Sequence, residues 1–253
     1  MKNIIAIDTH THINHGSKFD SNTENKYYDA TLEYLTKVNK AAGIEKMLCS
    51  TFSSVLKTEE VEKENEYLFD LVQKVDYLYQ WVVIDPRNDA TFSQAKRILE
   101  NRKCVGIKLH PPCHEYSLEE YGEKIFTFAE KHSAIVQIHP EMRQDYILPF
   151  ADKYPGVTFI MAHLGSFGND HDVNVITKAK HRNVYLDTSG NASSQNHVIE
   201  YVVERAGSDR ILFGTDTYAA GFQRGRIEFA LISDEDKENI LKNNAEKLFK
   251  KFF

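Results

Sequence analysis

The segment Cys104-Val105-Gly106-Ile107-Lys108-Leu109-His110 is a short run of β-forming residues that ends in a lysine and a histidine. Successive side chains of a strand point to opposite faces. Val105 and the other apolar residues therefore share one face, and Gly106, Lys108 and His110 share the other. We expect the apolar face to pack under helices and the second face to line the interior of a sheet that closes on itself.

Seven further runs of this kind occur along the chain, and longer segments with helical periodicity separate them. The seven runs are Ile4–Asp8, Lys46–Thr51, Tyr79–Ile84, Ala134–His139, Val157–His163, Asn183–Ser189 and Arg210–Asp216. Eight strand–helix units in about 250 residues fit a (β/α)8 TIM barrel. An open, doubly wound sheet uses the same alternation and is the alternative. We expect one barrel domain over residues 1–253, closed by a last helix from Ser233 to about Phe249.

Composition narrows the class of protein. The chain has 253 residues, a formal charge of −6, 42% hydrophobic and 27% charged residues, which is typical of a globular domain and argues against disorder. Apolar runs such as Ile4–Ile7 fall far short of the ~20 residues of a membrane span. Three cysteines without CxxC spacing favour reduced thiols and a cytoplasmic location. The modest acidity disfavours a nucleic-acid partner, so we expect a small-molecule substrate and no membrane partner, with a homo-oligomer left open.

Ionisable residues stand where five of the predicted strands end. The first strand ends in Asp8-Thr9-His10-Thr11-His12, the fourth in Lys108 and His110, and the fifth, sixth and eighth in His139, His163 and Asp216. A barrel builds its active site at these C-terminal ends. Burying so many ionisable groups costs several kcal/mol each unless they are paired or bound to a metal.

The spacing of these residues predicts a metal site. His10 and His12, two residues apart on a strand, present two imidazoles on one face. Three histidines and one carboxylate with an open position are the ligand set of a catalytic zinc site rather than of a closed structural one. Imidazole and carboxylate ligands also suit Mn²⁺, Fe²⁺ or Co²⁺.

Several motifs together resemble a known family. They are Asp8-x-His10-x-His12, Gly106-Ile107-Lys108-Leu109-His110-Pro111, Ile138-His139-Pro140, Ala162-His163-Leu164-Gly165, Phe213-Gly214-Thr215-Asp216 and the tail Asn244-Ala245-Glu246-Lys247-Leu248-Phe249. In this order, and over nearly the whole chain, they are similar to the amidohydrolase superfamily. The closest likeness is to its amidohydrolase-related branch, which holds both hydrolases and metal-dependent decarboxylases.

The resemblance implies roles for individual residues. His10, His12, His139 and Asp216 would hold the metal, and one ion is favoured over two. Asp216 would also take a proton from the metal-activated water. His163 would lie beside the open coordination position and stabilise the negative charge that develops on the substrate.

The resemblance allows two roles for Lys108. In two-metal members a lysine of the fourth strand is carbamylated and bridges the metals. The pattern Lys108-x-His110-Pro111 looks more like the one-metal branch, in which Lys108 stays an ammonium and binds a substrate carboxylate, with His110 beside it. The long segment 14–28 carries Phe19, Tyr27 and Tyr28 and is interpreted as a lid. Equally, these aromatics fit the start of the buried face of the next helix.

The function expected from this pattern is metal-dependent hydrolysis of a small amide, ester or lactone through a metal-bound hydroxide. The enzyme alternative is non-oxidative decarboxylation of a small carboxylic acid. Both reactions need one Lewis acid and one proton shuttle, so the sequence does not separate them. The alternative outside enzymes is a barrel that binds metal without turnover.

Overall fold

A computed structural model describes residues 4–15, 29–166 and 170–253 and has the predicted (β/α)8 barrel. Most of the predicted lid, including Phe19, Tyr27 and Tyr28, lies outside the described residues. All neighbouring strands are parallel and follow the order β1 to β8. The strands are β1 (Ala6–Ile13), β2 (Ile44–Thr51), β3 (Leu78–Val83), β4 (Cys104–Leu109), β5 (Ile135–Ile138), β6 (Thr158–Met161), β7 (Val184–Asp187) and β8 (Ile211–Leu212).

Hydrogen bonds between β1 and the segment at β8 close the sheet. The backbone N–H of Thr9 donates to the carbonyl of Phe213 (2.9 Å), and the N–H of Asp216 donates to the carbonyl of His10 (2.7 Å). The carboxylate of Asp8, which is fully buried, accepts hydrogen bonds from both the N–H and the hydroxyl of Thr215 (3.0 and 2.7 Å). These contacts join residues about two hundred positions apart in the sequence.

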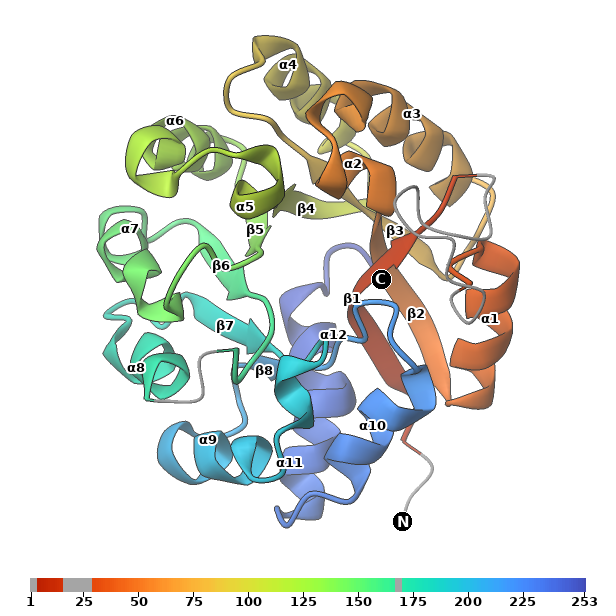
Figure 1. Ribbon diagram of the computed structural model, residues 1–253, viewed down its shortest axis with the longest axis vertical. Coiled ribbons are helices and arrows are strands. Elements are labelled where there is room, and N and C mark those ends of the chain that lie inside the picture. Colours follow the sequence, from red (N-terminus) through yellow and green to blue (C-terminus); the bar gives the residue numbers. More distant parts are fainter. Residues whose placement is uncertain (1–3, 16–28, 167–169) are drawn as a thin grey trace.

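Helices surround the strands (Figure 1). They are α1 (Leu32–Ala41), α2 (Phe52–Leu56), α3 (Val61–Val72), α4 (Asp89–Ile98), α5 (Pro111–His114), α6 (Leu118–Lys131), α7 (Leu148–Lys153), α8 (His171–Lys178), α9 (Val198–Ala206), α10 (Ala220–Glu228), α11 (Asp234–Glu238) and α12 (Asn244–Leu248). Short 3₁₀ turns lie at η1 (Thr58–Glu60), η2 (Gln144–Ile147) and η3 (Ala192–Ser194). Side-chain caps begin several helices; for example, the hydroxyl of Ser117 accepts from the N–H of Glu120 (3.2 Å) at α6.

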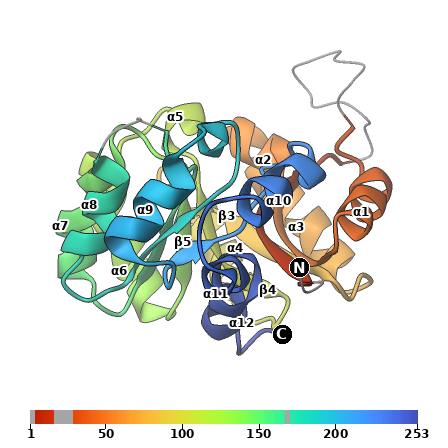
Figure 2. The same cartoon turned by 90° about the horizontal axis from the view of Figure 1, so that it is seen from below.

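The last helix departs from the expected uninterrupted form. A π-helical segment, η4 (Asn239–Asn243), separates α11 from α12. The carbonyl of Ile240 in this segment accepts from the N–H of Phe213 (3.0 Å), so the widened turn lies against the end of β8. Figure 2 shows α11 and α12 at the end of the barrel opposite α5.

An apolar layer fills the barrel interior near the end at which α12 lies. It is built from one cluster of buried side chains that come from seven strands and α12: Ile7, Leu48, Tyr79, Trp81, Val105, Ile135, Ile160, Leu212, Ala245 and Phe249, the last lying just beyond α12. Side chains from so many strands meet only inside a barrel, so the expected alternation is wrong for Val105. The pairing of β3 with β4 shifts between Gln80 and Trp81, which breaks the alternation at this point. Ile107 and Leu109 pack outside the sheet as expected.

In the part of the chain that the structure describes, no helix combines the length and the apolar character that a membrane span needs.

Gly106 lies where a side chain has no room. A Cβ atom there would lie 2.2 Å from the carbonyl oxygen of Ile135 and 2.7 Å from the Trp81 ring. We expect Gly106→Ala to lower the free energy of unfolding by about 1–3 kcal/mol, because the packed interior must shift to admit the methyl group. Urea unfolding of the purified variant measures this.

Gly221→Ala is the matched control, because a Cβ on Gly221, within α10, meets no atom within 4 Å. This variant should be as stable as the parent or slightly more stable. Equal stability of the two variants would contradict the packing described for β4.

Candidate metal centre

The side chains of His10, His12 and Asp216 converge at the C-terminal ends of β1 and β8. His12 Nε2 lies 3.2 Å from His10 Nε2 and 3.2 Å from Asp216 Oδ1, and His10 Nε2 lies 3.6 Å from the same oxygen. The two rings are buried, whereas the side chain of Asp216 is 20% exposed. Three of the four predicted metal ligands therefore form one cluster that can be reached from the Asp216 side.

Partners on the far side of the two rings direct both Nε2 atoms toward this cluster. The Nδ1–H of His10 donates to Asp187 Oδ2 (2.9 Å), and His12 Nδ1 lies 2.9 Å from the hydroxyl of Ser50. A neutral imidazole carries one proton, so His10 Nε2 is an acceptor. Two imidazole nitrogens and a carboxylate oxygen that lie this close together can hold a cation, and imidazole with carboxylate suits a divalent transition metal. A carboxylate behind a ligand histidine is a usual feature of such sites.

His139 lies next to His163 and His110. His139 Nδ1 is 3.0 Å from His163 Nε2, and the His139 ring stacks on the His110 ring with centroids 4.0 Å apart. His139 is thus beside the cluster of His10, His12 and Asp216 rather than within it. His110 also begins α5, where its Nδ1 accepts from the N–H of Cys113 (3.2 Å).

Lys108 is fully buried, and its Nζ lies 2.9 Å from His10 Nε2. Burial lowers the pKa of Lys108 to about 8, although the charges of Asp187 and Asp216 work in the opposite direction. The lysine expected at the barrel interior is therefore in direct contact with the first of the predicted ligands.

The two predicted catalytic residues have unusual backbone conformations. His163 and Asp216 have φ angles of +66° and +53°, a region that costs most residues about 1–2 kcal/mol. Hydrogen bonds hold both: the N–H of His163 donates to Asp187 Oδ1 (3.2 Å), and that of Asp216 donates to the carbonyl of His10. Such strain is concentrated at functional sites.

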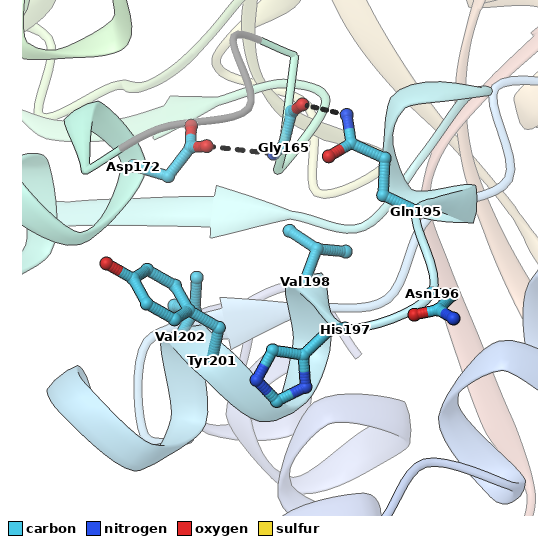
Figure 3. A pocket seen from close by; sticks show the side chains of 8 residues that line it. All are labelled: Gly165, Asp172, Gln195, Asn196, His197, Val198, Tyr201 and Val202. Carbon is cyan, nitrogen blue, oxygen red and sulfur yellow. Dashed lines mark hydrogen bonds between the residues drawn. The ribbon is translucent and has the colours of Figure 1, made fainter.

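The residues after His163 are also fixed. The N–H of Gly165 donates to Asp172 Oδ2 (3.0 Å), and its carbonyl accepts from the side chain of Gln195 (2.8 Å). Figure 3 shows these bonds at the edge of a pocket of about 490 Å³ beside α8 and α9. Its lining contains no predicted site residue, so we interpret this region as support for the turn that carries His163.

Several polar residues that hold the site were not singled out from the sequence. Ser50 contacts His12, and the side chain of Gln144 donates to the carbonyls of Ala162 and His163 (3.0 Å each). The inward direction of Ser50 could have been predicted from strand alternation, since Ser50 lies two residues after the interior-facing Leu48 of β2. Gln144 lies in a 3₁₀ turn, where no periodicity indicates its direction.

The surroundings of the site lower the pKa values of several of its histidines and of Asp216, for different reasons. Burial lowers the pKa of His10 to about 3, and it also lowers the pKa values of His12, His110, His114 and His139. For Asp216, burial raises the pKa, but the hydrogen bond with His12 and the neighbouring histidine charges outweigh burial and hold the pKa well below its usual range. The site is therefore built to keep imidazoles neutral and Asp216 ionised.

These shifts predict that the metal-free protein is labile in acid. Unfolding restores ordinary imidazole pKa values near 6.5, so the unfolded chain binds more protons below that pH and stability falls as the pH drops from 6.5 to 5. Two carboxyls, Asp8 and Asp172, oppose this because burial raises their pKa values to about 7 and about 6. The effect of five imidazoles on stability exceeds that of two carboxyls. We therefore expect the free energy of unfolding to fall by more than about 1 kcal/mol for each pH unit between 6.5 and 5.

Urea unfolding with chelator at pH 7, 6 and 5 measures this loss. His114→Gln, which removes a buried imidazole outside the cluster, should reduce the slope, and the exposed His197→Gln should leave it unchanged. A stability that stays constant over this range would contradict the neutral, buried state of the histidines.

Solved structures of similar fold include two decarboxylases and a probable hydrolase. A 2,6-dihydroxybenzoate decarboxylase from Rhizobium aligns with a TM-score of 0.74 and 18% identity over 99% of both chains. A dihydroxybenzoic acid decarboxylase from Polaromonas sp. JS666, with bound manganese and 2-nitroresorcinol, gives 0.73 and 18% over 99% of this chain and 97% of that one. A probable 2-pyrone-4,6-dicarboxylic acid hydrolase from Acinetobacter baumannii, with citric acid bound, gives 0.68 and 17% over 98% and 100%.

At this level of identity these likenesses establish the fold alone. Among curated proteins, none matches the chain. A family model described as Amidohydrolase matches residues 7–251, which is almost the whole sequence and includes every residue of the cluster. The chain therefore belongs to the amidohydrolase family, as its motifs predict.

Proposed function

We propose that this chain is a metal-dependent hydrolase that acts on a small molecule with a carboxylate and an amide, ester or lactone carbonyl. The observation that carries the proposal is the convergence of His10 Nε2, His12 Nε2 and Asp216 Oδ1 beside the Nζ of Lys108. We assign one ion, with Zn²⁺ as the first candidate, to His10, His12 and Asp216. His139, the fourth ligand expected from the sequence, contacts His163 and would have to turn toward the cluster to bind the same ion. When bound, such an ion supplies Lewis acidity and makes hydroxide available near neutral pH.

Asp216 is the proposed general base. Its Oδ1 faces the two histidines, and its side chain is exposed enough for water to reach it. Hydrolysis forms a bond from a water oxygen to the carbonyl carbon and breaks the bond to the leaving nitrogen or oxygen. Asp216 accepts the proton that water loses and returns it to the leaving atom, so atoms and charges balance. His163, whose ring lies 5.2 Å from that of His10 between centroids, would stabilise the charge on the carbonyl oxygen in its doubly protonated form, in which the Nε2–H donates to that oxygen.

Lys108 is the proposed anchor for the substrate carboxylate. It is a buried cation at the centre of the site, and Asp187 and Asp216 are the carboxylates whose charges act on it most. An ammonium that is shielded from water binds a carboxylate more strongly than an exposed one does.

Decarboxylation is the second candidate, because most of the solved structures found to be similar are decarboxylases of hydroxylated aromatic acids. In that reaction the bond between the ring carbon and the carboxylate breaks, CO₂ leaves, and the carbon takes a proton that comes from solvent and is relayed through Asp216, so one proton is consumed for each CO₂ released. Assays of hydroxybenzoates and of carboxylated lactones separate the candidates. Release of CO₂ without incorporation of water oxygen would overturn hydrolysis.

Asp216→Asn should lower kcat by about 10²–10⁴-fold, because the amide cannot take the proton. Steady-state kinetics with the metal-loaded protein measure this. Asp89→Asn is the control, since Asp89 is an exposed carboxylate that pairs with Lys124 (2.7 Å). Activity of Asp216→Asn equal to that of the parent would remove Asp216 from the mechanism.

Lys108→Met should raise KM for the acid substrate about tenfold or more, because a charge-assisted contact is lost. It should leave KM unchanged for the same substrate with its carboxylate converted to a methyl ester. Metal affinity should stay close to that of the parent. Loss of metal binding in this variant would instead support the reading of Lys108 as a carbamylated metal ligand.

A further inference from the structure

The hydroxyl of Ser189 lies at the centre of a group of contacts around two predicted site residues, His10 and His163. Ser189 is fully buried just after β7 and donates its proton to Asp187 Oδ1. Its oxygen lies 2.9 Å from His10 Nδ1 and 3.0 Å from His163 Nδ1. One hydroxyl therefore touches a predicted metal ligand, a predicted catalytic residue and the carboxylate behind them.

These contacts determine which nitrogen of each ring carries a proton. The Ser189 proton is used on Asp187, so the oxygen acts as an acceptor toward both rings. His163 Nδ1 also lies 3.2 Å from the carbonyl oxygen of Ser189, which can only accept, and His10 Nδ1 faces Asp187 Oδ2. Both rings therefore carry a proton on Nδ1, and in the neutral form both have a lone pair on Nε2.

The Nε2 atoms are the ones that face the site. His10 Nε2 points toward His12, Asp216 and Lys108, and His163 Nε2 lies 3.0 Å from His139 Nδ1. His10, His163 and Asp187 also have ligand atoms close enough to hold an ion of their own. The Ser189 hydroxyl bonds to all three, so we interpret this second group as a hydrogen-bond network.

Close packing fixes the position of Ser189 relative to both rings. A Cβ on Gly214 would lie 2.9 Å from His10 Cβ and 3.1 Å from Ser189 Cβ, and a Cβ on Gly190 would lie 2.9 Å from His163 Nδ1. Gly190 has a φ of +74°, which suits glycine at this turn. The two glycines therefore allow the serine and the rings to approach one another.

We propose that Ser189 is a positioning residue that shares the Asp187 carboxylate between His10 and His163 and so makes both rings present an unprotonated Nε2 to the site. The inference rests on the metal site of the proposed function for its effect on metal binding. It goes beyond that function because it links the ligand His10 to His163 through one buried hydroxyl.

The test compares Ser189→Ala with Ser193→Ala. Ser193 is also buried, and its hydroxyl contacts the carbonyl of Gly190 and the side chain of Gln223 but neither ring. ¹⁵N NMR of the metal-free proteins reports which ring nitrogens are protonated. In the parent and in Ser193→Ala, His10 and His163 should both be protonated at Nδ1. In Ser189→Ala, His163 Nδ1 keeps only its longer contact with the backbone carbonyl of residue 189 (3.2 Å), so the His163 signals should shift toward a mixture of the two tautomers.

Titration with Mn²⁺ is the second readout. Loss of a partner behind a ligand histidine commonly weakens metal binding by about 10–100-fold, so Ser189→Ala should raise the Kd by this amount and Ser193→Ala should not. If Ser189→Ala does not fold, Ser189→Cys replaces it, because a thiol is a weak acceptor of similar shape.

Unchanged tautomers and an unchanged Kd in Ser189→Ala, with only a lower stability, would overturn the proposal. If the parent protein binds no Mn²⁺ or Zn²⁺, the proposed function fails, and the NMR comparison alone decides the role of Ser189.

Discussion

The hydrogen bonds that join β1 to the segment at β8 are the constraint on which the rest of the site depends. Asp216 lies next to His10 and His12 because its own N–H donates to the His10 carbonyl. The buried Asp8 carboxylate strengthens the same junction through Thr215. The closure of the barrel and the assembly of the cluster are therefore one event, and a chain that left the sheet open would leave His10 and His12 without their carboxylate.

Burial then determines the chemistry of the groups that closure brings together. An isolated charge in such an interior costs free energy, and here each buried charged group has a hydrogen-bonded or oppositely charged partner. Asp187 is fully buried and accepts hydrogen bonds from His10, Ser189 and the His163 backbone. Lys108 has the opposite charge at the same depth. Burial lowers the pKa values of His10, His12 and His139 and keeps these rings neutral, which is the state in which imidazole binds a metal.

Sequence periodicity predicts the barrel and the burial of the main polar residues in its interior, because the alternation along a strand indicates which side chains point inward. In β4 the alternation holds from Ile107 onward, because Ile107 and Leu109 pack outside the sheet and Lys108 is buried on the other face beside His10. It fails at Val105, where the shifted pairing of β3 and β4 turns an apolar residue inward. It also gives no warning of the π-helical segment η4, which depends on a contact with distant Phe213.

The site was predictable to the extent that each residue ends a strand. His10, His12 and Asp216 meet as their positions indicate, whereas the nearest neighbours of His139 are His163 and His110. The supporting contacts of Ser50 and Gln144 depend on distances across the barrel, which no local pattern contains.

The metal content of protein purified without chelators tests the central claim most directly. Elemental analysis should find about one divalent transition metal per chain, lost when His12 is replaced by Ala. A protein that contains no metal and takes up none when Zn²⁺ or Mn²⁺ is supplied would contradict the account. About two ions per chain would contradict the single-ion assignment and would make Lys108 and His163 ligands.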